Sequence, residues 1–106
     1  MYSRNIADTV DMTVTALCAD FRRRSDALLA HSVTHRTRME YKYLNFKLLS
    51  AADEIVGEGL GERMIEEIGY SIGYAYTELD HMSESTYKKM KRQVKENIAK
   101  KLHLID

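Results

Sequence analysis

The sequence of 106 residues contains no proline and no tryptophan, and it has a single cysteine, Cys18. Because proline breaks helix interiors, its absence allows most of the chain to be helical. One cysteine excludes an internal disulfide and is typical of a reducing compartment. No apolar run approaches the roughly 18 residues of a membrane span, and residues 1–12 lack the apolar core of a signal peptide. We therefore expect a cytoplasmic protein without a membrane partner.

The chain also has no net charge, but its charges are segregated. Residues 21–50 have seven basic and two acidic side chains, a net +5, and residues 83–106 have seven and three, a net +4. Residues 51–82 have one basic and eight acidic side chains, a net −7, and residues 1–20 have one and three, a net −2. Such blocks indicate either a basic binding face or an acidic element packed between two basic ones.

Apolar residues recur every three or four positions in the first half of the chain, which predicts two helices. The first begins between residues 3 and 8 and runs to about Ala30. Its last turns hold three arginines (22–24), where cations complement the helix dipole. The second helix spans about 34–56. We expect the two to form a long antiparallel hairpin over residues 1–56.

The second helix is apolar on more than one side. A narrow seam suited to packing on another helix consists of Tyr41, Leu44, Leu48, Ala51 and Ile55. Tyr43, Phe46 and Leu49 widen the apolar surface beyond that seam. A helix of this kind is usually buried on more than one side. We therefore expect either a central position in the fold or a homodimer contact.

Glycines at positions 57, 59 and 61 predict a turn. A third helix follows at about 62–74, in which Gly69 and Gly73 either allow close approach of another helix or end it. After a short connection, a last helix begins at Ser83 and turns an apolar face inward, made of Tyr87, Met90, Val94, Ile98 and Leu102. No strand pattern is present. The fold class is all-α: one domain, 1–106, of four to five helices, with residues 62–106 as its second half.

Enzymatic and metal sites are poorly supported by the sequence. His31 and His35 have the spacing of a zinc-protease pair, but Ser32 replaces the required Glu and no third ligand is in view. The adjacent acidic pairs, including Glu66 and Glu67, point in different directions around a helix and indicate a solvated acidic face. Cys18 lies beside an apolar face, as inert core thiols do. We expect no enzyme, no cofactor and no metal.

The last helix carries the pattern most suggestive of function. Ser83 is a favourable N-cap residue, and the side chains left facing outward or flanking the start are Ser83, Glu84, Ser85, Lys88, Lys89, Arg92 and Lys95. Lys and Arg at such positions neutralise phosphates and can reach base edges, and serine hydroxyls can donate to the DNA backbone. The alternative is that this is an ordinary lysine-rich, solvated helix face. The seven tyrosines fall at helical spacing and do not favour single-stranded RNA.

The stretch MSESTYKKMKRQVKENIAKKLHL (82–104) resembles the recognition-helix half of the helix-turn-helix in region four of bacterial sigma factors. It is similar also to the C-terminal part of phage ArpU-type transcriptional regulators. The matches are Met82, Ser83, Thr86, Tyr87, Ala99 and Leu102. The resemblance implies that Ser83 caps the recognition helix, that Tyr87 packs it on the preceding helix, and that its outward residues meet the major groove.

The preceding residues depart from that pattern. The small residue, the apolar residue and the glycine of the motif would fall on Thr77, Asp80 and His81, so residues 70–81 match only loosely.

Two functions follow from the sequence. The first is a DNA-binding transcriptional regulator of phage or mobile-element origin, whose partner is double-stranded DNA. The second is a non-enzymatic helical interaction module, a homodimer or adaptor, whose basic helix docks an acidic partner. RNA polymerase or another protein would be the partner in this case. Arg22–Arg24 and the basic residues up to Lys47 would either extend a DNA footprint or pair internally with Glu62, Glu66 and Glu67.

Overall fold

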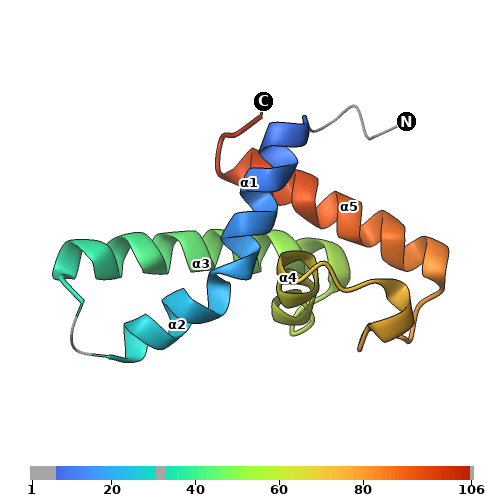
Figure 1. Cartoon of the computed structure of the whole chain (residues 1–106), viewed down its shortest axis with the longest axis horizontal. Helices are drawn as coiled ribbons and strands as arrows, with labels where there is room; N and C mark the ends of the chain where they lie inside the picture. Colours follow the sequence, from blue (N-terminus) through green and yellow to red (C-terminus); the bar gives the residue numbers. More distant parts are fainter. Residues whose placement is uncertain (1–6, 31–32, 106) are drawn as a thin grey trace.

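The computed structural model describes residues 7–30 and 33–105, and these residues form helices and connections with no β-strand among them. In chain order the elements are α1 (Asp8–Ala19), α2 (Phe21–Leu29), α3 (His35–Val56), α4 (Gly61–Gly69), the 3-10 helix η1 (Tyr74–Tyr76) and α5 (Glu84–Lys101). In Figure 1, α3 lies along the long axis of the molecule, with α2 beside its first half and α4 and α5 against its second. The expected all-α class is confirmed.

The first helical segment is two helices, whereas the apolar spacing predicted one. α1 ends at Ala19 and α2 begins at Phe21, with Asp20 between them at φ −93° and ψ 0°. The carboxylate of Asp20 accepts hydrogen bonds of 2.6 and 2.5 Å from Arg23. The three arginines therefore lie in the first turn of α2, and their predicted place in a C-terminal turn is wrong. Residues 3–6 of the predicted helix lie outside the described ranges.

The break at Asp20 also changes the partner of each half. α2 runs antiparallel to α3 and forms the hairpin with it, whereas α1 packs on α4 and α5 (Figure 1). The end of α2 is fastened to α3 by Arg38, whose guanidinium donates to the carbonyls of Leu28 at 2.7 Å and Ala30 at 2.8 Å. The hairpin is therefore shorter than expected.

α3 matches its predicted bounds within one residue. Thr34 is the N-cap residue, and its hydroxyl accepts a hydrogen bond of 3.2 Å from the backbone N–H of Thr37. Gly57 ends the helix at φ +109°, in the left-handed region that glycine adopts without strain. The turn predicted over residues 57–61 is present at residues 57–60, and Gly61 begins α4.

α4 ends at Gly69, before the predicted boundary near residue 74. A Cβ atom on Gly69 would lie 2.5 Å from the backbone nitrogen of Ala19 and 2.7 Å from the carbonyl carbon of Cys18. Of the two roles considered for the glycine pair, Gly69 has the first: it allows α1 to pack closely on α4. Only a residue without a side chain leaves room for the α1 backbone here. Gly73 lies outside α4, with open space around it.

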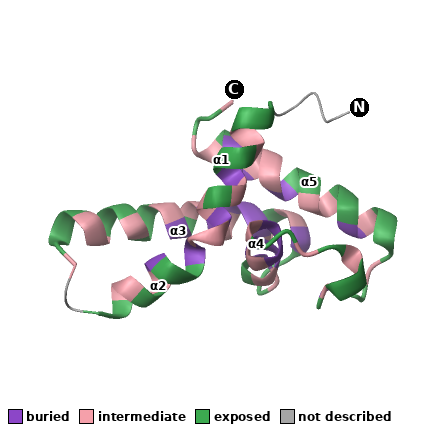
Figure 2. Cartoon of the chain, viewed as in Figure 1, coloured by how far each residue is buried: buried purple, intermediate pink, exposed green. Residues whose placement is uncertain are grey.

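The core lies where α1, α3, α4 and α5 meet (Figure 2). Its fully buried side chains include Val14, Leu48, Met64, Ile65, Ile68, Tyr87, Val94 and Ile98. Of the residues predicted to face inward from the last helix, Met90 and Leu102 are half-buried at the edge of this core.

A set of buried hydrogen bonds joins the break between α1 and α2 to α3. The side chain of Arg24 is buried, and its Nε donates to Oδ1 of Asn45 at 2.7 Å. A second guanidinium nitrogen donates to the carbonyl of Leu17 at 2.6 Å, and the amide of Asn45 donates to the carbonyl of Phe21 at 3.2 Å. Because buried polar groups are costly when unpaired, this set fixes the direction in which α2 leaves α1.

Candidate nucleic-acid interface

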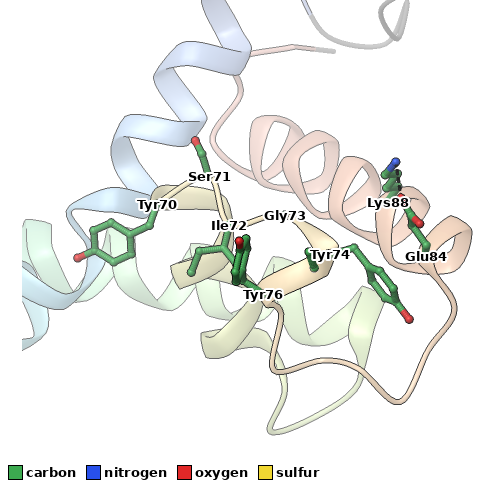
Figure 3. A pocket seen from close by; sticks show the side chains of 9 residues that line it. Tyr70, Ser71, Ile72, Gly73, Tyr74, Tyr76, Glu84 and Lys88 are labelled. Carbon is green, nitrogen blue, oxygen red and sulfur yellow. Dashed lines mark ion pairs between the residues drawn. The ribbon is translucent and has the colours of Figure 1, made fainter.

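α5 begins with the predicted cap. The hydroxyl of Ser83 accepts a hydrogen bond of 3.3 Å from the backbone N–H of Thr86, which satisfies one of the free N–H groups of the first turn. Glu84 follows, and its negative charge is favourable at a helix N-terminus. Its carboxylate also pairs with Lys88 one turn later at 2.8 Å, as Figure 3 shows.

Six of the seven predicted site residues are exposed at the start of α5. They are Ser83, Glu84, Ser85, Lys88, Lys89 and Arg92, and we call this surface the α5 outer face. Within the described residues, Lys89 and Arg92 make no side-chain hydrogen bond or ion pair. Their cationic groups are therefore available to an external partner.

Lys95, the seventh predicted residue, does not share this open face. Its side chain is only 24% exposed, and its Nζ lies 3.2 Å from a carboxylate oxygen of Asp11 on α1. Lys91 is also turned inward, and its Nζ donates to the carbonyl of Ile72 at 2.6 Å. Burial lowers the pKa of Lys91. These two lysines hold α5 to the rest of the fold.

The orientation of α5 depends on a buried carboxylate that the sequence pattern placed on a solvated face. Glu67 is fully buried, so that expectation is wrong for this residue. Its carboxylate accepts hydrogen bonds from the hydroxyl of Tyr87 at 2.6 Å, the backbone N–H of Glu78 at 3.0 Å and Nε of Arg63 at 2.9 Å, as well as from the hydroxyl of Thr77. Tyr87 thus packs α5 against α4.

This contact shifts two pKa values. Burial acts to raise the pKa of Glu67, but the hydrogen bonds from Thr77, Tyr87, Glu78 and Arg63 act in the opposite direction and leave it below its ordinary value. Burial, together with the neighbouring carboxylate, raises the pKa of Tyr87 to about 12. Both groups therefore hold one protonation state across the physiological range.

The acidic helix α4 leaves the α5 outer face uncovered. Glu66 pairs with Arg22 of α2 and lies 3.3 Å from Arg63, whose guanidinium also lies 3.4 Å from Glu78. Among residues 7–30 and 33–105, no ion pair joins α4 to the lysines and arginine of the α5 outer face. The arginine partners of Glu66, Glu67 and Glu78 are Arg22 and Arg63, which do not belong to α5.

The first basic block is largely engaged within the fold. Besides Arg22, Arg24 and Arg38, whose contacts are given above, Arg23 pairs with Asp20 and its guanidinium lies 5.3 Å from the centre of the Tyr41 ring. The free end of the α2–α3 hairpin and the start of α5 also lie at opposite ends of the molecule (Figure 1). The hairpin therefore does not extend the α5 outer face.

The connection before α5 differs from a tight helix-turn-helix. That motif joins its helices through a turn of about three to four residues, whereas residues 70–83 contain one 3-10 helix and irregular backbone. Leu79 is the buried residue of this connection, and the neighbouring Thr77 reaches Glu67. Residues 70–81, which match the sigma-factor pattern only loosely, do not form an α-helix.

A shallow hollow of about 660 Å³ opens between this connection and α5 (Figure 3). It is lined by residues 70–76 together with Glu84 and Lys88, and its rim includes the exposed rings of Tyr70 and Tyr76. The expectation that the tyrosines follow helical spacing is wrong here, because Tyr70 and Tyr76 lie in the connection and η1. An exposed aromatic ring, that of Tyr76, and the basic side chain of Lys88 thus line the same hollow.

Neither a family model, nor a curated protein, nor a solved structure matches this chain. Within the described residues, no group of three or more His, Cys, Asp or Glu side chains could hold a metal ion, and no helix is long and apolar enough to cross a membrane. His31 of the histidine pair considered above lies outside those residues. Cys18 is buried, which raises its pKa to about 12.

Proposed function

We propose that this domain binds double-stranded DNA through the α5 outer face and acts as a transcriptional regulator of phage or mobile-element origin. The observation that supports the proposal is that Lys88, Lys89 and Arg92 lie open on one end of one helix. No ion pair within the described residues joins α4 to these three side chains, and Glu66 of α4 pairs with Arg22 and Arg63. A helix end of this kind fits the major groove of B-DNA. Such a regulator acts in the cytoplasm.

In the proposed mechanism, some residues of the α5 outer face contact the DNA backbone and others contact the bases. Lys89 and Arg92 contact phosphates and set the register of the helix on the duplex. The N-terminal side chains Glu84, Ser85 and Lys88 enter the groove, where a carboxylate accepts from cytosine N4 and a lysine donates to guanine. The pair between Glu84 and Lys88 is exposed, so it opens at little cost when bases replace it.

The experiment is fluorescence anisotropy with a labelled random-sequence duplex over a salt series. We expect log K to fall linearly with log salt, and the slope to lose roughly two units in Lys89→Ala/Arg92→Ala, because each phosphate contact contributes about 0.9. The matched control is Lys42→Ala/Lys100→Ala, which removes the same charge from exposed positions elsewhere and should keep the slope. Absence of binding at about 50 mM salt, or equal losses in both variants, would contradict the proposal.

A helical interaction module is the second candidate, and two observations favour it. The tight turn that presents a recognition helix is replaced by residues 70–83, and Arg22, Arg24 and Arg38 of the first basic block are engaged internally. In this case the α5 outer face docks an acidic protein surface such as one on RNA polymerase. Co-elution with purified polymerase, lost in Lys89→Ala/Arg92→Ala and combined with no duplex binding, would favour this function.

A further inference from the structure

α3 presents an apolar stripe to solvent. Met39, Tyr43 and Phe46 are 54%, 50% and 68% exposed, and their spacing of four and three places them on one side of the helix. We call these three residues the α3 stripe. The buried residues of α3, such as Leu48 and Ala51, lie on the opposite side. α3 packs on α2, α4 and α5, as the central position expected from its sequence requires, but no other element covers this side of it within the described residues. Contiguous exposed apolar surface usually marks an interaction site.

Two shallow hollows of nearly equal size flank the middle of the stripe. One, of about 420 Å³, is lined by Met39, Glu40, Tyr43 and Leu44. The other, of about 410 Å³, is lined by Phe46, Leu49, Ser50, Asp53, Glu54 and Glu58. A ring entering each hollow from a partner would find apolar walls, and the stripe itself supplies a ring beside each one.

The charges around the stripe differ between its two ends. Exposed Arg36 and Lys42 flank its beginning, and exposed Glu54 and Glu58 follow its end. The side chain of Arg36 is 91% exposed and meets only Glu40, at 3.5 Å. A surface that is basic at one end and acidic at the other is complementary to itself when the two copies run antiparallel.

We infer that a second copy of this chain packs on the α3 stripe, with the two α3 helices antiparallel about a two-fold axis between Tyr43 and Phe46. An isologous contact of this kind uses the same patch twice. In this register Tyr43 of each copy lies against Phe46 of the other, and Arg36 of each approaches Glu54 of the other. The α5 outer face supplies none of these residues, so the inference does not depend on the proposed function.

The first test is the mass of the full chain by sedimentation equilibrium at roughly 100 µM, well above a micromolar dissociation constant. We expect twice the chain mass of 12.3 kDa for the wild type and 12.3 kDa for Phe46→Glu. Phe46 is exposed, so circular dichroism should show unchanged helix content in the variant. Met12→Glu alters a similarly exposed apolar residue on α1 and should remain a dimer.

The second test concerns the register. Arg36→Glu and Glu54→Arg should each weaken dimerisation by roughly tenfold, and the double variant should recover it. Because Glu54 also pairs with Lys101, recovery in the double variant is the informative result. A monomeric wild type would show that a second copy is not the occupant of the stripe. A dimer that survives Phe46→Glu would place the contact elsewhere, and charge reversal without recovery would overturn the antiparallel arrangement.

Discussion

The hydroxyl of Tyr87 on α5 donates a hydrogen bond of 2.6 Å to Oε1 of Glu67 on α4, and both side chains are buried. Thr77 donates to the same oxygen, and Arg63 and the backbone N–H of Glu78 donate to the other. Because the carboxylate is surrounded by donors, it remains charged in the interior without leaving lone pairs unsatisfied. One residue thus joins α4, the connection and α5.

Replacing Glu67 by glutamine should destabilise the fold strongly. The amide turns one acceptor into a donor that faces other donors, and it removes the charge that pairs with Arg63. We expect the free energy of unfolding in urea to fall by about 3 kcal/mol. Glu62→Gln, on the exposed side of the same helix, should change it by less than about 0.5 kcal/mol. Equal effects would show that Glu67 has no special role.

Acid stability should depend on the same carboxylate. The pKa of Glu67 is lowered by folding from its ordinary value of 4.5. Its contribution to stability is therefore present above pH 4.5 and is lost as the pH falls through the folded pKa. Urea unfolding measured from pH 7 downward should show a decline below about pH 4.5 that is shallower in Glu67→Gln. A parallel decline in both proteins would assign acid unfolding to other groups.

The free energy of unfolding at alkaline pH should depend on the ionisation of Tyr87. Its pKa is raised from 10.0 to about 12, so the neutral phenol contributes stability that is present below pH 10 and is lost between pH 10 and 12. Tyr87→Phe should cost about 1–2 kcal/mol at pH 7, because Glu67 loses a donor. It should also flatten the stability profile above pH 10. Tyr76→Phe, at an exposed ring, should keep the wild-type profile, and a wild-type profile in Tyr87→Phe would refute the assignment.

Gly69 and Gly73 should respond in opposite ways to alanine. At Gly69 the new Cβ would meet the backbone of Ala19 at 2.5 Å, which cannot yield without moving α1. We expect a loss of about 2–3 kcal/mol. At Gly73, with φ −87° and open space, alanine should be neutral or stabilise by about 0.4–1 kcal/mol through the unfolded state. Thermal unfolding of both variants measures the difference, and similar melting temperatures would contradict the close approach.

Arg24 and Arg23 provide a second matched pair. Arg24→Met leaves Oδ1 of Asn45 and the carbonyl of Leu17 without their buried donor. We expect a loss of about 3 kcal/mol. Arg23→Met removes an exposed ion pair with Asp20 and should cost less than about 1 kcal/mol. If urea unfolding gave equal losses, the break between α1 and α2 would not depend on Arg24.

Sequence periodicity predicted the features that depend on local chemistry. The bounds of α3, the Ser83 cap and the inward residues of α5 follow from apolar spacing and capping preference. The break at Asp20 could not be predicted, since Val14, Leu17 and Phe21 keep helical spacing across it. It results from tertiary contacts, namely the buried guanidinium of Arg24 and the crossing at Gly69.

The position of Glu67 could not be read from its residue type. A carboxylate beside another carboxylate normally indicates solvent. Three of the four donors that make burial tolerable come from two other segments of the fold, Thr77 and Glu78 from the connection and Tyr87 from α5. One local signal was present, because Glu67 lies one helical turn after the buried Met64. The α5 outer face could be predicted because exposed basic positions remain when the apolar ones turn inward. Lys95 was the exception, as its partner Asp11 lies far away in the sequence.

Because α5 is anchored through its inner side, the residues on its outer face can be substituted with little effect on the fold. Lys89 and Arg92 make no side-chain hydrogen bond or ion pair within the described residues. Substitutions at these two positions should change the exposed surface of α5 and leave the free energy of folding nearly constant. Glu67, Thr77 and Tyr87 are bound to one another and admit few replacements. If α5 binds DNA as proposed, recognition and folding are encoded by separate residues, and a new binding preference can evolve on an unchanged scaffold.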